Sequence, residues 1–262
     1  MPTPAALSQI RQNLAALQPR RPARGKTFQL GPEVRQGRPD GRRPDGWRAD
    51  ALHEVLAAAP RHAVAAQGFA LALAMRASPD AIVWIAQSGG RSEMGELYGP
   101  GLSAWGLDPA NLLLVRVPDA AALLASGEEA LRSGAAGAVI LSGWGEAKAY
   151  SLTASRRLMM AAQTGSSLGV LVRANAQPAP SAAETRWSVA AAPSVPLPAQ
   201  APGRPAFLAR LLRSRSGAPP GEWRLEWDRE TRALVDPAAS GGLVSLPADR
   251  PAASGSRRPH AA

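Results

Sequence analysis

The first eighteen residues show a helical pattern of hydrophobic positions. Leu7, Ile10, Leu14 and Leu17 recur at spacings of three, four and three residues, with polar side chains between them. These spacings bring the apolar side chains to one face of a helix, and Pro19 cannot continue such a helix. The pattern therefore predicts an N-terminal amphipathic helix within residues 1–19.

A different pattern begins at Leu52. Five short, mostly continuous apolar runs, rich in Val, Ile and Leu, occupy residues 52–56, 81–86, 111–117, 137–141 and 168–172. Strands that are covered on both faces have this character. Helical patterns lie between the runs, at residues 63–76, 119–133 and 152–163. This alternation predicts an α/β fold over residues 50–192, with a parallel sheet and helices on both faces.

The segments around this core differ from it in composition. Residues 20–48 carry nine basic and three acidic residues among repeated Pro, Gly and Asp, so we expect 20–49 to be a basic, flexible connector with little to bury. A further strand is predicted at 185–190, followed by a Pro-rich linker at 193–205. Apolar runs around a Gly- and Pro-containing loop predict a C-terminal β-hairpin extension over 206–235. Residues 236–262 have the composition of a disordered tail.

The charge of the chain is strongly positive. Its 30 basic and 20 acidic residues give a formal net charge of +10, and nearly all of the basic residues are arginines. This leaves phosphate, acidic proteins and RNA open as partners, although a GC-rich genome that encodes arginine by default explains the bias equally well. The absence of cysteine excludes disulfides and thiolate chemistry, and three scattered histidines do not suggest a metal site. With neither a signal peptide nor a run of about 18 apolar residues, we expect a cytoplasmic protein without membrane contact.

The sequence can be searched for the motifs that nucleotide hydrolysis requires. A phosphate-binding P-loop needs Gly, four residues, and then Gly-Lys-Ser/Thr. Gly25, Lys26 and Thr27 supply the second half of this motif, but Arg20 stands where the first glycine is needed. The proper place for a P-loop, between the strand at 52–56 and the helix from 63, has no glycine or lysine. The following strands lead to Gln87 and Ser142 where a water-activating and a magnesium-holding carboxylate would stand. We therefore expect no enzyme activity, no cofactor and no metal.

Three further features have structural interpretations that compete with functional ones. Glu54 is interpreted as a strand-edge or helix-capped carboxylate rather than a catalytic base, and residues 99–101 as a tight turn at a sheet edge. Arginines and tryptophans gather in the predicted hairpin, as they do in interface hot spots and single-strand binding sites. The alternative is a hairpin that packs its tryptophans on the sheet. The candidate partner-binding residues of the hairpin are Arg210, Arg213, Arg215, Trp223 and Trp227.

Seven motifs in order give the chain a specific resemblance. They are LHEV at 52–55, ELYGPG at 96–101, GLDPANLLLV at 106–115, EEALRSG at 128–134, LTASRRL at 152–158, TRW at 185–187 and GEWRLEW at 221–227. Together they resemble the ImuA family, RecA-like accessory proteins of bacterial SOS mutagenesis cassettes. The stretch from 106 to 134 also resembles RecA itself.

The resemblance implies a RecA-like core and a non-catalytic role in translesion synthesis. The implied partners are an ImuB-like protein and an error-prone replicative-type DNA polymerase, with RecA open as a third and any contact with DNA indirect. Residues 143–150 and 174–183 stand where RecA has longer DNA-binding loops, which speaks against filament formation on DNA. The apolar stripe of the N-terminal helix, Leu7, Ile10, Leu14 and Leu17, is then a candidate docking element, either for its own core or for another RecA-like core.

Two other classes of function stay open at this point. One is a residual nucleotide-binding ATPase of the RecA type. The other is a single-stranded DNA-binding module that acts through its arginines, whose affinity would fall steeply with salt.

Overall fold

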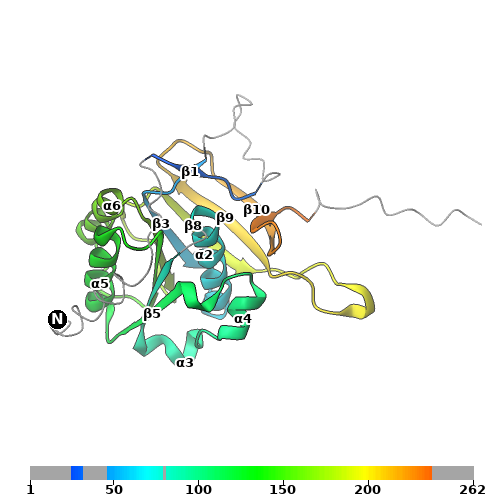
Figure 1. Cartoon of the computed structure of the whole chain (residues 1–262). Helices are drawn as coiled ribbons and strands as arrows, with labels where there is room; N and C mark the ends of the chain where they lie inside the picture. The colour runs from blue at the N-terminus through cyan, green and yellow to red at the C-terminus, as the bar shows by residue number, and fades with distance from the viewer. Residues whose placement is uncertain (1–24, 32–45, 79–80, 238–262) are drawn as a thin grey trace, which may run out of the picture.

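The centre of the molecule is a nine-stranded sheet. A computed structural model describes residues 25–31, 46–78 and 81–237, and its strand order is β11-β10-β9-β8-β3-β7-β6-β4-β5 (Figure 1). Six strands are mutually parallel. Their bounds are Leu52–Ala57 (β3), Ile82–Gln87 (β4), Leu112–Val117 (β5), Ala138–Trp144 (β6), Leu168–Ala174 (β7) and Thr185–Ala191 (β8). Three antiparallel strands extend the sheet beyond β8: Ala206–Ser214 (β9), Gly221–Asp228 (β10) and Ala233–Val235 (β11).

Helices cover both faces of the sheet, as predicted. On one face lie α2 (Ala63–Ala77), α3 (Arg91–Met94) and α4 (Gly99–Ala104), and their buried residues join one hydrophobic cluster. On the other face α5 (Ala120–Ser133) and α6 (Leu152–Gly165) build a second cluster. Single-turn 3-10 helices are η1 (Pro60–His62), η2 (Ser88–Gly90), η3 (Pro109–Asn111) and η4 (Pro198–Gln200). The predicted α/β class, with a parallel core and a C-terminal hairpin, is confirmed.

The ends of α5 and α6 follow from local chemistry. The side chain of Asp119 accepts a hydrogen bond from the backbone N–H of Ala122, and Ser151 does the same for Ala154. Each thereby satisfies one of the free donors of a first helical turn. Gly134 ends α5 in the left-handed conformation at φ 63°, which glycine adopts without strain.

The tight turn predicted at residues 99–101 is wrong. Gly99, Pro100 and Gly101 form the first turn of α4 instead. Proline fits this place because the first N–H groups of a helix need no intrahelical acceptor. A Gly-Pro-Gly run thus begins a short helix, which packs Leu102 into the core.

The prediction of a flexible connector with little to bury does not hold for residues 25–31 and 46–49. There β1 (Thr27–Phe28) pairs antiparallel with β2 (Trp47–Arg48), and Phe28, Leu30 and Trp47 are buried in the core. The ring of Trp47 meets the ring of Trp187 edge-on at 5.4 Å between centroids. Three isolated apolar side chains suffice to anchor this basic stretch, because large rings bury much area each. The predicted helix at 1–19 and the tail from 238 lie outside the described residues.

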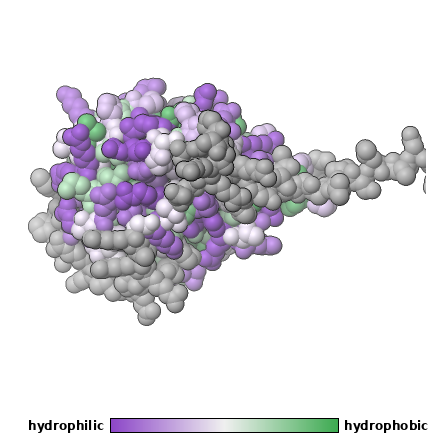
Figure 2. Space-filling model, turned by 90° about the horizontal axis from the view of Figure 1, so that it is seen from above, coloured by the Kyte–Doolittle hydropathy of each residue, from purple (hydrophilic) through white to green (hydrophobic). Residues whose placement is uncertain are grey.

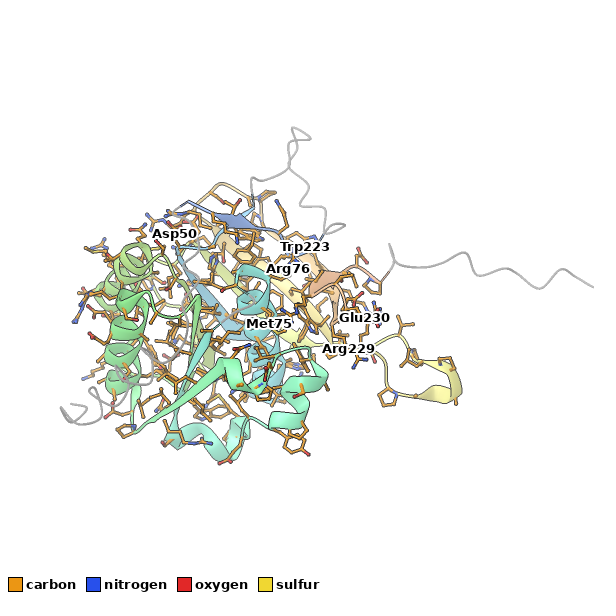
Figure 3. All side chains as sticks on the ribbon, viewed as in Figure 1. Asp50, Met75, Arg76, Trp223, Arg229 and Glu230 are labelled. Atoms are coloured by element: carbon orange, nitrogen blue, oxygen red, sulfur yellow. The ribbon has the colours of Figure 1, made fainter. Side chains whose placement is uncertain are left out.

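Arg76 connects this anchored stretch to the turn between β10 and β11. Arg76 lies at the end of α2 (Figure 3). It donates from Nε to the carbonyl of Gln29 at 2.9 Å and from Nη1 to the carbonyl of Arg232 at 3.2 Å. Burial lowers the pKa of its guanidinium. In the view from above, most of the described residues at the surface are polar, and hydrophobic ones occur singly or in small groups (Figure 2).

Candidate functional site

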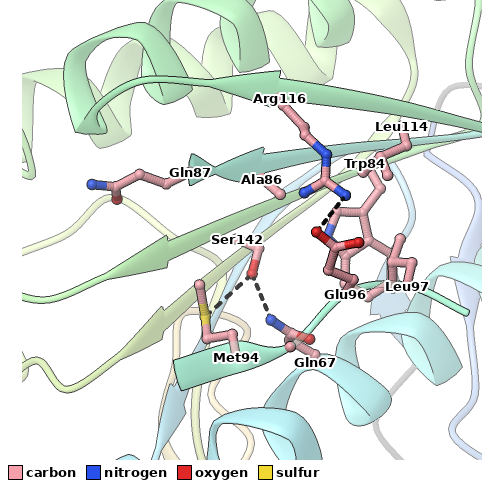
Figure 4. Close-up of a pocket in the computed structure, with 11 residues that line it drawn as sticks. Gln67, Trp84, Ala86, Gln87, Met94, Glu96, Leu97, Leu114, Arg116 and Ser142 are labelled. Atoms are coloured by element: carbon pink, nitrogen blue, oxygen red, sulfur yellow. Dashed lines mark hydrogen bonds and ion pairs between the residues drawn. The ribbon is translucent and has the colours of Figure 1, made fainter. Parts of the chain in front are cut away.

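The topology creates a crevice at the carboxyl ends of the parallel strands β4 and β6. The chain leaves β4 toward the face of α3 and α4, and it leaves the adjacent strand β6 toward the opposite face, where α6 lies. Open α/β sheets bind their ligands at such a switch point. A pocket lies there, lined by Trp84 and Gln87 of β4, Ser142 of β6, Gln67 of α2 and the loop before α4 (Figure 4).

Neutral side chains fill the base of this crevice. Gln67 donates from Nε2 to the Ser142 hydroxyl at 3.0 Å, and that hydroxyl points in turn to Met94 Sδ at 3.7 Å. Gln87 accepts a hydrogen bond from the backbone N–H of Trp144 at 3.3 Å. The two strand-end residues where an ATPase would carry carboxylates are thus bound to neighbours of the same crevice. We call Gln67, Gln87, Met94 and Ser142 the neutral cluster.

The only charges drawn in this close-up lie at the rim. Arg116 of β5 and Glu96 form an ion pair at 3.5 Å, and both side chains are more than a third exposed (Figure 4). The pair is screened by solvent and contributes little to stability. The base of the crevice therefore offers hydrogen bonds but no charge to a ligand.

The loop after β3 lacks the features of a P-loop. Pro60 has no N–H. The N–H of Ala58 donates to the carbonyl of Val189, and the N–H of His62 donates to the carbonyl of Ala59. No residue of 57–62 has a positive φ, and the loop holds no lysine. A phosphate needs several free N–H groups that converge on it, together with a cation.

The tripeptide Gly25, Lys26 and Thr27 is not part of a phosphate loop either. Gly25 donates its N–H to the Asp50 carboxylate at 3.3 Å, and Thr27 begins β1 rather than a helix. A carboxylate on this N–H occupies the place that an anion would take. The match to half of the motif is thus accidental, as its context in the sequence indicates.

The candidate tryptophans of the hairpin face the core. Trp227 is only 1% exposed, stacks on Trp105 with 5.9 Å between centroids, and donates its Nε1–H to the Trp105 carbonyl at 3.0 Å. Trp223 lies on the same face of the hairpin, 5.9 Å from the ring of Trp187. Alternate residues of a strand point to opposite faces, so tryptophans at 223 and 227 share one side. A partner surface that contains Trp227 is therefore wrong, and the packing alternative holds for both rings.

The candidate arginines divide between two roles. Arg213 donates to the carbonyls of Ser181 and Ala183, and its pKa is lowered by burial and by the charges of Arg186 and Arg215. It fastens the loop before β8. Arg210 is exposed on β9, 3.9 Å from Glu222, and Arg215 is exposed at the hairpin loop. The structure does not bring the five candidates of the hairpin together, and Leu7, Ile10, Leu14 and Leu17 lie outside the described residues.

Sequence reasoning missed a buried charged cluster around Glu54. Glu54 is 2% exposed, and its carboxylate lies 2.7 Å from Nε of Arg186 and 3.7 Å from Nη1 of Arg173. The interpretation of Glu54 as a strand-edge or helix-capped group is wrong, because β3 lies between β8 and β7 in the middle of the sheet. The signal that could have found the cluster is Arg173, a charge at the end of an otherwise apolar run.

The same arginine holds two loops together. Glu146, in the loop after β6, accepts from Arg173 Nη2 at 2.9 Å and also from the backbone N–H of Gln177, in the loop after β7. The Tyr150 ring covers the Arg173 guanidinium at 4.7 Å, and burial raises the pKa of its phenol to about 12. The loops at 143–150 and 174–183 are thereby tied to each other and to the sheet. We call Glu54, Glu146, Tyr150, Arg173 and Arg186 the charged cluster.

The described residues were also compared with the requirements of a metal site and of a membrane-spanning helix. Across residues 25–31, 46–78 and 81–237, no three His, Asp or Glu side chains form a group that could hold a metal ion. In these same ranges, no helix has both the length and the apolar character that a bilayer crossing requires.

The fold and the crevice define an α/β protein whose switch-point crevice has a neutral base and an ion pair at its rim. Comparison with known proteins then gives a specific likeness. The chain is 35% identical over 157 residues to Protein ImuA of Caulobacter vibrioides strain NA1000 / CB15N, covering 56% of this chain and 60% of the relative. Protein ImuA from strain ATCC 19089 / CIP 103742 / CB 15 of the same species matches to the same extent. The matched part of the chain is ImuA-like, as its motifs indicate.

The match to Protein ImuA covers only part of each chain. The chain spans 60% of the length of these curated relatives. No protein-family model matches it. Among solved structures, the crystal structure of SulA from Pseudomonas aeruginosa aligns with 26% identity and a TM-score of 0.36, covering 47% of this chain and 97% of that chain.

Proposed function

We propose that the chain is a non-catalytic, RecA-like accessory protein of an SOS-induced mutagenic translesion synthesis complex. It acts in the cytoplasm through contacts with an ImuB-type polymerase-like protein and an error-prone replicative-type polymerase, with RecA as a further partner. The observation that carries the proposal is the 35% identity to Protein ImuA over 157 residues. The seven ordered motifs extend from residue 52 to residue 227 and support the same assignment.

The site geometry supports the non-catalytic part of the proposal. A RecA-type ATPase needs a phosphate loop after the first core strand and carboxylates at two strand ends. Here Pro60 and bound N–H groups occupy the loop, and Gln87 and Ser142 occupy the strand ends. Protein contacts, rather than nucleotide chemistry, then remain as the means of action.

Binding of ATP separates this proposal from a residual ATPase. With labelled ATP and magnesium we expect no binding that depends on the loop at 57–62. Affinity in the micromolar range, lost when residues of that loop are changed, would favour the ATPase instead. Binding of a single-stranded oligonucleotide is measured in parallel, and an affinity that falls steeply with salt would favour the DNA-binding module.

Co-purification tests the partner contacts. The full chain is mixed separately with the ImuB-type protein, the polymerase and RecA, and retention on the immobilised chain is measured. We expect the ImuB-type protein or the polymerase to be retained. Retention of neither, by a chain with an intact unfolding transition, would contradict the proposal.

The N-terminal stripe offers a sharper version of this experiment. Ile10→Asp combined with Leu14→Asp places charge in the apolar stripe, which costs several kcal/mol if the stripe is buried in a contact. We expect RecA binding to fall while the thermal midpoint stays unchanged. Gln9→Asp combined with Asn13→Asp, which places the same charge among the polar residues between the stripe positions, serves as the control. Unchanged binding with a lowered midpoint would assign the helix to its own core.

A further inference from the structure

The sheet ends in two edges of different character. One edge is β11, which has only three residues, all of them buried. Leu234 of β11 donates its N–H to the carbonyl of Leu30, so the anchored N-terminal stretch covers this edge. A side chain at Gly31 would collide with the Leu234 carbonyl, since its Cβ would lie 1.9 Å away. This edge is short and covered, as edges of stable monomeric sheets usually are.

The other edge, β5, is twice as long, and no described part of the chain covers it as Leu30 covers β11. It pairs with β4 over six consecutive residues without a bulge, and among the described residues no strand pairs with its outer side. Its sequence, LLLVRV, begins with four apolar residues that are half-buried on both faces of the sheet. Figure 1 shows β5 at the rim of the molecule. Such an edge presents a row of N–H and C=O groups to another strand.

The one charged side chain of β5 does not block this edge. Arg116 forms its ion pair with Glu96, which precedes α4 and lies over the face of the sheet (Figure 4). Proline follows the strand only after Val117, and lysine is absent from it. The outer side of β5 therefore lacks the proline and lysine residues that commonly protect an edge strand, and its sequence resembles that of a central strand.

We propose that β5 pairs antiparallel with β5 of a second copy of this chain, which makes one sheet continuous across a two-fold axis at Leu114. Because this axis is perpendicular to the sheet, the α5 and α6 helices of both copies lie on the same side of the joined sheet. Side chains that lie opposite each other across the axis then point to the same face. On the axis itself, Leu114 lies opposite Leu114 of the second copy. In this register Leu113 meets Val115, and Leu112 meets Arg116. Apolar residues oppose apolar residues, and no like charges are opposed.

The charges at the two ends of β5 favour a second copy in this direction. Asp108, exposed just before the strand, caps η3, while Arg116 lies near the opposite end. Antiparallel pairing brings Arg116 of each copy toward the strand start of the other, where Asp108 lies. Parallel pairing would bring Arg116 beside Arg116. The edge of β5 thus complements itself, independently of the proposed role in translesion synthesis.

A single cysteine tests the geometry, because the chain has none of its own. Directly opposed residues of an antiparallel pair have Cα atoms about 4.5 to 5.5 Å apart, which suits a disulfide. Leu114→Cys is expected to give a covalent dimer of twice 27.2 kDa under mild oxidation, at low protein concentration. Leu208→Cys, on β9 and 39% exposed, is the matched control and is expected to stay monomeric on a denaturing gel. A cross-linking yield no higher for Leu114→Cys than for the control overturns the proposal.

Charge exchange at the same position provides the second test. Leu114→Lys and Leu114→Glu each place like charges on the two-fold axis, and each is expected to raise the dimer dissociation constant by about fivefold. An equimolar mixture of the two variants is expected to recover the dimer, measured by sedimentation velocity, which also establishes that both variants fold. A wild-type chain that stays monomeric throughout a dilution series overturns the proposal, even if a strand of another protein binds at β5. A dissociation constant that stays unchanged in both variants overturns it as well.

Discussion

The charged cluster and the neutral cluster both lie in the parallel half of the sheet, yet their chemistry is opposite. Around Glu54 a buried carboxylate and two arginines tie β3, β7 and β8 together. Around Ser142, at the crevice where open α/β sheets bind ligands, amide and hydroxyl groups bind one another without charge. Buried charges require partners, so we expect Glu54, Arg173 and Arg186 to depend strongly on one another. We expect the neutral cluster to tolerate loss of a member.

Removal of the central carboxylate tests that contrast most strongly. Glu54→Gln leaves Arg173 and Arg186 buried beside an uncharged amide. Loss of one member of a buried ion pair costs about 3 to 5 kcal/mol, because the remaining charge is left uncompensated. We expect the free energy of unfolding in urea to fall by roughly 3 kcal/mol, since the amide oxygen still accepts one hydrogen bond.

The matched control is Glu222→Gln on the hairpin. Glu222 is half exposed and 3.9 Å from Arg210, so its removal is expected to change the unfolding free energy by less than about 1 kcal/mol. Equal effects of the two variants would contradict the distinction between a buried cluster that acts as a unit and an exposed pair.

The neighbour of Glu54 in β3 sharpens the comparison, because His53 is equally buried but neutral. Its Nε2 bonds the Arg48 carbonyl at 2.9 Å, and its Nδ1 bonds the Thr185 hydroxyl at 2.7 Å. Desolvation lowers the pKa of His53 from 6.5 to about 4. The unfolded chain therefore takes up this proton first as pH falls. The stabilisation by neutral His53 is fully present above pH 6.5 and is lost between 6.5 and about 4.

The expected loss across this window is roughly 3 kcal/mol, from a shift of about 2.5 pKa units. Other groups titrate in the same range, so the measurement is the difference between wild type and His53→Gln in urea unfolding at several pH values. The difference is expected to shrink as pH falls through the window. A constant difference from pH 7 to pH 4 would contradict a neutral, desolvated His53.

The two clusters also differ in how far the sequence could predict them. Gln87 and Ser142 were expected at strand ends, because apolar runs of parallel strands stop where their carboxyl ends meet the crevice. Gln67 and Met94 were not expected, since they come from α2 and α3, whose orientation depends on tertiary packing. The charged cluster was missed because Glu54 and Arg186 are 132 residues apart in the chain. Pairing of that kind leaves no local pattern.

Hydrophobic periodicity predicted which elements exist better than it predicted where the strands end. β6 and β7 continue past their apolar runs, through Ser142 to Trp144 and through Arg173 to Ala174. In both strands a polar residue ends the apolar run, but neighbouring strands continue the backbone pairing. Phe28 and Trp47 were overlooked for a related reason, because single apolar residues in a basic stretch have no periodicity. Their burial depends on the surface that β3, β8 and α2 offer them.

In the neutral cluster, Ser142→Ala removes a hydroxyl that has two contacts. Gln67 loses its acceptor at 3.0 Å, but its side chain is only partly buried and can turn toward solvent. Loss of one such hydrogen bond costs about 1 kcal/mol. We therefore expect a decrease of this size in the unfolding free energy, a third of the effect of Glu54→Gln. A loss as large as that of Glu54→Gln would mean that the neutral cluster also acts as a unit.

The smallest effect is expected within the charged cluster itself, at a group that carries no charge. The Tyr150 hydroxyl is buried beside Gly143 and finds no hydrogen-bond partner among the described residues, whereas its ring covers Arg173. Tyr150→Phe keeps a ring over the guanidinium and removes a hydroxyl whose desolvation is uncompensated. We expect the free energy of unfolding to stay unchanged or to rise by up to about 1 kcal/mol. Tyr150→Leu, which removes the aromatic face, is expected to lower it. If Tyr150→Phe were instead as destabilising as Ser142→Ala, the hydroxyl would belong to the hydrogen-bonded cluster, and the ring alone would not explain why Tyr150 lies over Arg173.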